Sequence, residues 1–230
     1  MSSSQQRRRF LKIVVTGGGA AVLGASTVAA AATPQEEAEV TPSEDLMREH
    51  GVLRRVLLIY EEAARRLSAG EKPPTDLLAT TAGIVRKFVE DYHEHVEETE
   101  VFPRLQKAGK QVELVRTLLA QHQAGRKLTA TILDNARAAT QGTPAPRTVV
   151  LDAIAAFARM YRPHAAREDT ELFPAFQKLF TRAEFDRLGD RFEEAEHKML
   201  GSAGFEGTLE QVVQLEKSLG INDLARLTPK

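Results

Sequence analysis

The sequence predicts an all-α protein built around an antiparallel four-helix bundle, with additional helices at its C-terminal end. Apolar residues recur at three- and four-residue spacing through four long stretches, which is the period of an amphipathic helix. Segments rich in glycine and proline separate these stretches, and none of them has the sustained alternation of an exposed strand. Long helices joined by short connections pack as antiparallel neighbours in a bundle.

The bounds of the four bundle helices follow from the apolar stripes and from the prolines and glycines between them. The predicted helices cover residues 43–70, 75–101, 111–141 and 147–172. Pro103 is expected to stop the second helix, because proline lacks the backbone N–H that continues a helix. Pro163 lies inside the fourth helix, where it is expected to cause a kink.

Residues 177–230 are predicted to form a helical cap on the bundle. Thr181 and Glu184 have the spacing of a capping box, so a helix is expected to begin there and to run to about residue 200. A last helix is expected over residues 209–219, ended by a glycine. The loop between them is expected to hold Gly201, Gly204 and Gly207.

Residues 1–32 are interpreted as a targeting segment that resembles a twin-arginine signal peptide. Its basic residues are Arg7, Arg8, Arg9 and Lys12. A weakly apolar, glycine-rich stretch follows, and then small residues at 29–32 that suit cleavage. The alternative, a membrane anchor, is disfavoured by the glycines. We expect export through the twin-arginine machinery to the periplasm or another extracytoplasmic space, no stable membrane span after cleavage, and an acidic linker over residues 33–42.

Charge and composition exclude several classes of function. The formal net charge is -1, and removal of the four basic residues of the targeting segment would leave -5 (-1 minus 4). No clustered basic face of the kind that binds nucleic acid is indicated. The sequence contains no cysteine, which excludes disulfides, thiolate-bound metal clusters and a cysteine nucleophile.

An internal repeat contains the histidines and glutamates that are candidates for metal binding. The segment HEHVEETEVFP begins at His93, and HAAREDTELFP begins 71 residues later at His164. Both contain His, three residues, Glu and, further on, Phe-Pro. His50 and His122 are 72 residues apart, and an arginine follows each of them by four residues. The bundle is therefore predicted to consist of two helix pairs related by a pseudo-twofold axis.

Six side chains of the repeat are expected to converge in the core as metal ligands. A His and a Glu four residues apart lie on one helix face, so both can reach the same ion. Buried carboxylates need a counter-charge, which two divalent cations would supply. Nitrogen and oxygen donors without sulfur suit iron, manganese or zinc. The alternative, that each His is an ordinary core residue, explains the duplicated spacing poorly. The candidates are His50, His93, Glu97, His122, His164 and Glu168.

Four further acids follow the candidate ligands in the repeat. Glu98 and Asp169 are candidates for accepting hydrogen bonds from the imidazole N–H groups, with solvated or interhelical pairing as the alternative. Glu100 and Glu171 lie one turn further along, where exposure at the end of the bundle competes with a role near the metals. His95 and His197 are expected at the surface.

These motifs resemble the hemerythrin superfamily, specifically its hemerythrin-like, histidine-histidine-glutamate (HHE) cation-binding domain. The resemblance covers about residues 43–176 and implies a non-haem, oxo- or hydroxo-bridged centre of two iron ions, with manganese or zinc less expected. It also implies that His50 and His164 bind one iron and that His93 and His122 bind the other. Glu97 and Glu168 would bridge the two ions.

The sequence departs from the oxygen-carrying members at two positions. They have a fifth His four residues after the third-helix His, where this chain has Arg126, and a bridging Asp where it has Glu168. The resemblance therefore implies a more open centre and argues against reversible oxygen transport.

Three classes of function follow from such a centre. The first is binding of, or reaction with, dioxygen, nitric oxide or peroxide. The second is an oxidoreductase of the peroxidase, nitric oxide reductase or ferroxidase type, which would need an electron donor. The third is iron storage or delivery.

Overall fold

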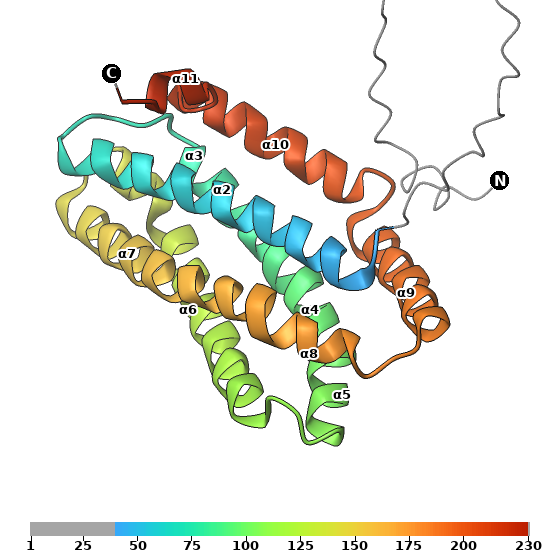
Figure 1. Ribbon diagram of the computed structural model, residues 1–230. Helices are drawn as coiled ribbons and strands as arrows, with labels where there is room; N and C mark the ends of the chain where they lie inside the picture. Colours follow the sequence, from blue (N-terminus) through green and yellow to red (C-terminus); the bar gives the residue numbers. More distant parts are fainter. Residues whose placement is uncertain (1–39, 230) are drawn as a thin grey trace, which may run out of the picture.

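The computed structural model describes residues 40–229, and within them it is all-helical, with no strands (Figure 1). The predicted signal peptide, residues 1–32, lies outside the described residues. No helix within residues 40–229 is long and apolar enough to cross a membrane.

The first bundle helix, α2 (Pro42–Ser68), begins with a complete capping box. The Thr41 side chain accepts from the Glu44 backbone N–H, and the Glu44 carboxylate accepts from the Thr41 N–H. Pro42 occupies the first turn, where its missing N–H costs nothing. The apolar stripe of α2 is buried against the other bundle helices, with Val56, Ile59 and Tyr60 fully enclosed.

The second bundle helix is a continuous path of five segments. They are α3 (Leu77–Ile84), the π-helical segment η1 (Val85–His93), α4 (Glu94–Val96), the π-helical segment η2 (Glu97–Val101) and α5 (Phe102–Lys107). The expectation that Pro103 stops this helix is wrong, because Pro103 lies in the first turn of α5. The Phe102 N–H bonds to Glu97 O, five residues back. This wide π-turn makes room for a ring that would clash in a regular helix.

The third bundle helix, α6 (Val112–Thr140), agrees with its prediction, and the fourth begins three residues early as α7 (Pro144–Arg167). The α7 helix continues through Pro163. The fourth path then runs through the π-helical segment η3 (Glu168–Leu172) into α8 (Phe173–Gln177). Thus both copies of the repeat have a π-turn that starts at the candidate ligand Glu and precedes Phe-Pro.

The C-terminal helices cover one side and one end of the bundle (Figure 1). The predicted capping box of Thr181 and Glu184 opens α9 (Arg182–Leu200). The last long helix, α10 (Gly204–Leu219), lies along α2 and starts five residues before its predicted bound. Gly220, with a φ of 69°, ends it in the left-handed region as predicted. A short helix not foreseen from the sequence, α11 (Leu224–Leu227), follows.

The two ends of the bundle have different interiors. At the end where loops join α2 to α3 and α6 to α7, here called the loop end, the core is aliphatic and aromatic (Figure 1). Towards the other end, the interior holds buried histidines and carboxylates. Because the candidate metal centre lies there, this end is called the centre end. The candidate ligands therefore lie off the middle of the bundle, near the start of α2.

Candidate metal centre

The structure brings the six candidate ligands together between the four bundle helices. Each of these residues is at most 4% exposed. The histidines come from α2, the end of η1, α6 and the last turns of α7, while the two glutamates open η2 and η3. π-turns are frequent at functional sites, and here they begin at the two glutamates that face the cluster. The six are His50, His93, Glu97, His122, His164 and Glu168.

Each of the two buried carboxylates lies between two imidazoles. Glu168 Oε2 is 3.2 Å from His50 Nε2 and 3.1 Å from His164 Nε2. Glu97 Oε1 is 3.6 Å from His93 Nε2, and its Oε2 is 3.5 Å from His122 Nε2. Both carboxylates thus have the positions of bridges between two groups of histidines.

The histidines form two pairs, and these differ from the pairs that the resemblance implied. His50 Nε2 lies 3.1 Å from His93 Nε2, and His122 Nε2 lies 3.2 Å from His164 Nε2. Among the described residues, two of the potential ligand groups are His50 with His93 and Glu97, and His122 with His164 and Glu168, with atoms within 4.8 Å of one another. A third group, Glu94 with Glu98 and His122, lies on the outer side of His122, where Arg126 pairs with both glutamates. The structure therefore does not group His50 with His164, as the resemblance implied. The Nε2 contacts join His50 to His93 and His122 to His164, and the carboxylates lie between these pairs.

All four imidazoles are held through their Nδ1 atoms. Asp169 accepts from His50 at 2.7 Å and Glu98 accepts from His122 at 2.9 Å. Sequence reasoning proposed both of these acceptors. The remaining acceptors, which it missed, are Glu49 for His93 at 2.6 Å and Gln121 for His164 at 2.8 Å. Because these oxygens accept, every Nδ1 carries the proton and every neutral imidazole turns an Nε2 lone pair inward.

Two Nε2 lone pairs that face each other at 3.1–3.2 Å repel unless a positive charge lies between them. A metal–imidazole bond of about 2.1 Å places two nitrogens at right angles about 3 Å apart, which matches the observed pairs. In addition, the four carboxylate oxygens of Glu97 and Glu168 are buried and accept no well-aligned hydrogen bond among the described residues. Such oxygens need an ion or water as partner. The donor set therefore fits two divalent cations.

The pKa values of the cluster also indicate buried charges that are not balanced. Burial lowers the pKa of His93 and that of His122. Burial opposes protonation of His50 too, but the Asp169 and Glu168 carboxylates raise its pKa to about 9. Burial, with the Glu168 charge, raises the pKa of Glu97 well above its usual value. Protons thus neutralise part of the cluster, and a cation would displace them.

Two arginines hold the outer carboxylates in place. Arg54 donates to Asp169, and Arg126 donates to Glu98 at 2.8 Å. Arg126 also lies 2.9 Å from the buried Glu94 carboxylate, so it points away from the cluster. The position that holds a fifth His in oxygen carriers therefore supplies no ligand. Both arginines are four residues after a candidate ligand, so each fixes the acceptor of its own helix's His.

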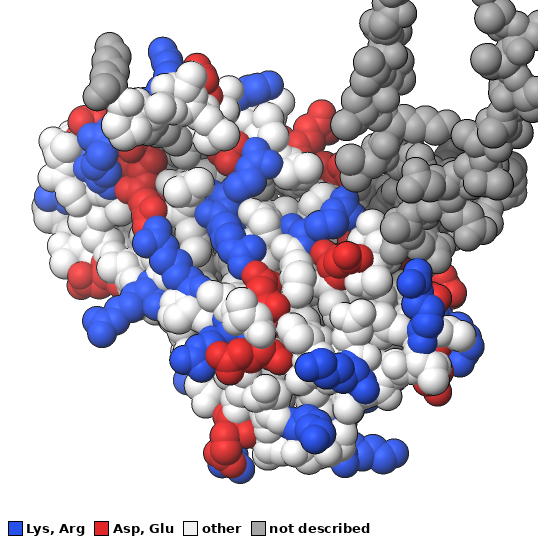
Figure 2. Space-filling model, in the orientation of Figure 1, with Lys and Arg blue, Asp and Glu red and all other residues white. Residues whose placement is uncertain are grey.

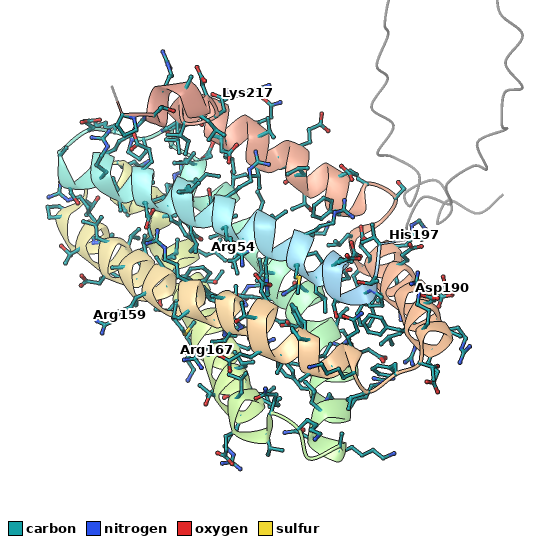
Figure 3. All side chains as sticks on the ribbon, in the orientation of Figure 1. Arg54, Arg159, Arg167, Asp190, His197 and Lys217 are labelled. Atoms are coloured by element: carbon teal, nitrogen blue, oxygen red, sulfur yellow. The ribbon has the colours of Figure 1, made fainter. Side chains whose placement is uncertain are left out.

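The other acids and histidines singled out from the sequence lie away from the imidazoles. Glu100 pairs with Arg104 and Arg191, and Glu171 pairs with Arg167. His95 and His197 are exposed, and Figure 3 places His197 on α9 at the edge of the molecule. Acidic and basic side chains are interspersed over the face shown in Figure 2.

Glu49 and Gln121 had one weak signal in the sequence. Each immediately precedes a candidate ligand of the repeat, His50 or His122, so they occupy equivalent positions 72 residues apart. A residue next to a ligand on a helix points about 100° away from it, which is why each serves the His of a neighbouring helix instead.

Comparisons with known proteins agree with this geometry. The profile of the "Hemerythrin HHE cation binding domain" matches residues 41–176, more than half of the chain. The chain is 46% identical over 190 residues to uncharacterized protein Rv1995 of Mycobacterium tuberculosis and to uncharacterized protein Mb2018 of Mycobacterium bovis. The alignment covers 83% of this chain and 74% of each relative. No solved structure matches the chain at a significant level. With two buried His/Glu groups that indicate a binuclear metal site, the chain belongs to the hemerythrin HHE cation-binding family.

Proposed function

We propose that the protein binds two iron ions in the buried cluster and uses them to bind, or react with, dioxygen, nitric oxide or peroxide. The observation that carries this proposal is the arrangement of two facing imidazole pairs with two carboxylates that accept no well-aligned hydrogen bond from the described residues. Nitrogen and oxygen donors suit iron, and manganese or zinc are the alternatives that metal analysis distinguishes.

Each residue of the cluster has a defined role in this proposal. The four histidines would hold the ions through their Nε2 atoms, and Glu97 and Glu168 would hold them through their carboxylate oxygens. Six protein side chains for two ions would leave open positions for a small ligand. When bound, the iron pair supplies redox chemistry at these open positions. The Nδ1–H bonds to the outer acceptors fix the ring orientation and increase the basicity of Nε2.

Aromatic side chains limit what can reach the centre. Phe173 stacks on the His50 ring at 5.6 Å, and Phe102 stacks on the His122 ring at 5.5 Å. Both phenylalanines belong to the repeated Phe-Pro, so each copy of the repeat covers a histidine of the other. The rings exclude bulk water from the imidazoles and favour small ligands such as diatomic molecules or peroxide.

The same observations bear on the alternative functions. Since Arg126 supplies no ligand, the open positions favour reaction over reversible transport, as in an oxidoreductase that draws on an electron donor. Storage or delivery of iron calls for a labile site, whereas all four imidazoles here are buried and held through Nδ1.

The experiment is a metal analysis and an ultraviolet–visible spectrum of the purified protein, with and without azide and after reduction. We expect about two irons per chain and charge-transfer bands that shift with azide. Stoichiometric zinc, or no metal and no azide response after anaerobic reconstitution with iron, would contradict the proposal. Multiple turnovers of peroxide or nitric oxide with an added electron donor would establish catalysis.

Export by the twin-arginine route is a separate part of the proposal. It rests on the basic residues near the N-terminus, and it is consistent with a cofactor that is inserted before translocation. The double substitution Arg7→Lys with Arg8→Lys should retain the protein in the cytoplasm. Undiminished export of this variant in cell fractionation would disprove the route.

A further inference from the structure

The two halves of the repeat differ in charge at one position that contacts the ligands. Glu49 and Gln121 are equivalent in the repeat, and each accepts from the Nδ1 of the His on the neighbouring helix. Glu49 Oε2 lies 2.6 Å from His93 Nδ1, whereas the neutral Gln121 Oε1 lies 2.8 Å from His164 Nδ1. A carboxylate thus serves one half of the centre where an amide serves the other.

The two other acceptors are alike in both halves. Asp169 and Glu98 are carboxylates, and an arginine pairs with each of them. The half with His50 and His93 therefore has two carboxylate acceptors. The half with His122 and His164 has one carboxylate and one amide.

Both oxygens of Glu49 are engaged by neutral donors. Oε2 accepts from His93, and Oε1 accepts the Tyr92 hydroxyl at 2.9 Å. Glu49 and Tyr92 are almost fully buried. When metal is bound and the Glu49 proton is released, Glu49 accepts from both donors as a carboxylate, and its charge is directed at the imidazole.

We infer that Glu49 makes the two metal positions unequal, so that the ion held by His50 and His93 is bound more tightly and is the first to be oxidised. This inference rests on the proposed function, because it assumes that ions occupy the cluster. A carboxylate acceptor raises the basicity of an imidazole more than an amide does, and a more basic ligand stabilises the higher charge of the metal. Glu49 thus acts as a positioning and tuning residue through His93.

The first test uses zinc and needs no redox chemistry. Zinc is titrated into metal-free protein in competition with a chromophoric chelator, and the two stepwise dissociation constants are compared. Glu49→Gln should weaken the tighter step about 10–100-fold, while Gln121→Glu should strengthen the weaker one. The double exchange, Glu49→Gln with Gln121→Glu, should restore two unequal steps. Equal steps in the unchanged protein, or steps that none of these variants alters, would overturn the inference.

The second test uses iron-57 and Mössbauer spectroscopy. One equivalent of ferricyanide removes one electron from the diferrous protein and is reduced to ferrocyanide, so one ferrous ion becomes ferric. For the unchanged protein we expect a valence-localised spectrum with a single ferric signal. This signal should broaden or split in both single variants and should be single again in the double exchange. Identical spectra in all four proteins would contradict the inference while leaving the di-iron proposal intact. Unequal zinc binding without iron uptake would instead contradict the iron proposal alone.

Discussion

The two ends of the bundle are built from the same four helical paths, but the buried candidate ligands lie towards one of them. The loop end encloses apolar residues such as Val56, Ile59 and Leu78, each fully buried. The centre end encloses histidines and glutamates, several of whose oxygens accept no hydrogen bond among the described residues. Burial of apolar surface favours folding, whereas buried carboxylates without a counter-charge oppose it.

This difference assigns separate roles to the two ends. The loop end should stabilise the fold with or without metal, while the centre end should depend on a bound cation for its stability. Natural proteins often place such strained or unsatisfied groups at functional sites and compensate for them elsewhere. The following variants separate the two contributions.

A cavity at the loop end should give the largest loss of stability. Leu78→Ala removes a fully buried side chain on α3 and should cost about 2–5 kcal/mol in both the metal-free and the metal-loaded protein. Chemical denaturation measures this cost. The matched control is Leu58→Ala, at a residue 48% exposed, which should change the stability by less than about 0.5 kcal/mol. A loss confined to the metal-free form would contradict the division between the two ends.

The stability of the metal-free protein should fall as the pH rises from about 6.5 to 9. Burial raises the pKa of Glu49 and that of Glu94 to about 8, and the Asp169 and Glu168 carboxylates outweigh burial to raise that of His50 to about 9.

The sign follows from proton uptake. Over this window the folded state holds protons that the unfolded state has released, so a rising pH favours unfolding. Each such proton lowers the free energy of unfolding by about 1.4 kcal/mol per pH unit as the pH rises. The lowered pKa values of His93 and His122 act in the opposite direction, but below pH 6.5. Thermal unfolding at several pH values measures the trend, and bound metal should reduce it. A metal-free protein that becomes more stable up to pH 9 would refute this assignment.

A steric contact at the centre end should have an intermediate effect. A Cβ added at Gly125 would lie 1.9 Å from the Tyr161 hydroxyl, which donates to Glu94 at 2.6 Å. Gly125→Ala should therefore displace Tyr161 and cost about 1–3 kcal/mol. Gly51→Ala is the control, because a Cβ there meets no atom within 4 Å; it should stabilise α2 by about 0.5–1 kcal/mol. Denaturant midpoints that shift equally in the two variants would rule out the steric explanation.

An exposed arginine at the centre should affect metal binding more than folding. Arg54, on α2 in Figure 3, donates to Asp169, which holds His50. Arg54→Gln should weaken metal binding about tenfold and change the metal-free stability by at most about 1 kcal/mol. Arg162→Gln removes a similar surface pair, to Glu61, and should change neither quantity. Metal titrations that do not distinguish these variants would show that Arg54 has no role in positioning His50.

The sequence predicted the four bundle helices and placed the six candidate ligands on inward faces, because both depend on regular spacing. It missed the continuation of the helix through Pro103, since the π-turn that makes room for the ring leaves no trace in the apolar pattern. It also missed Glu49 and Gln121, because their contacts depend on how neighbouring helices are rotated. The implied pairing of the histidines failed for the same reason. The boundaries of the predicted signal, linker and cap remain predictions.

The buried histidines and glutamates at the centre end should bind two metal ions. The most direct measurement is anaerobic calorimetric titration of ferrous iron into the metal-free protein, beside the double variant Glu97→Gln with Glu168→Gln. These substitutions keep the shape of the side chains and remove the two carboxylates. We predict uptake of two ions per chain by the unchanged protein and its loss in a double variant that folds equally well. Absence of uptake, or equal uptake by both proteins, would show that these carboxylates do not hold two metal ions.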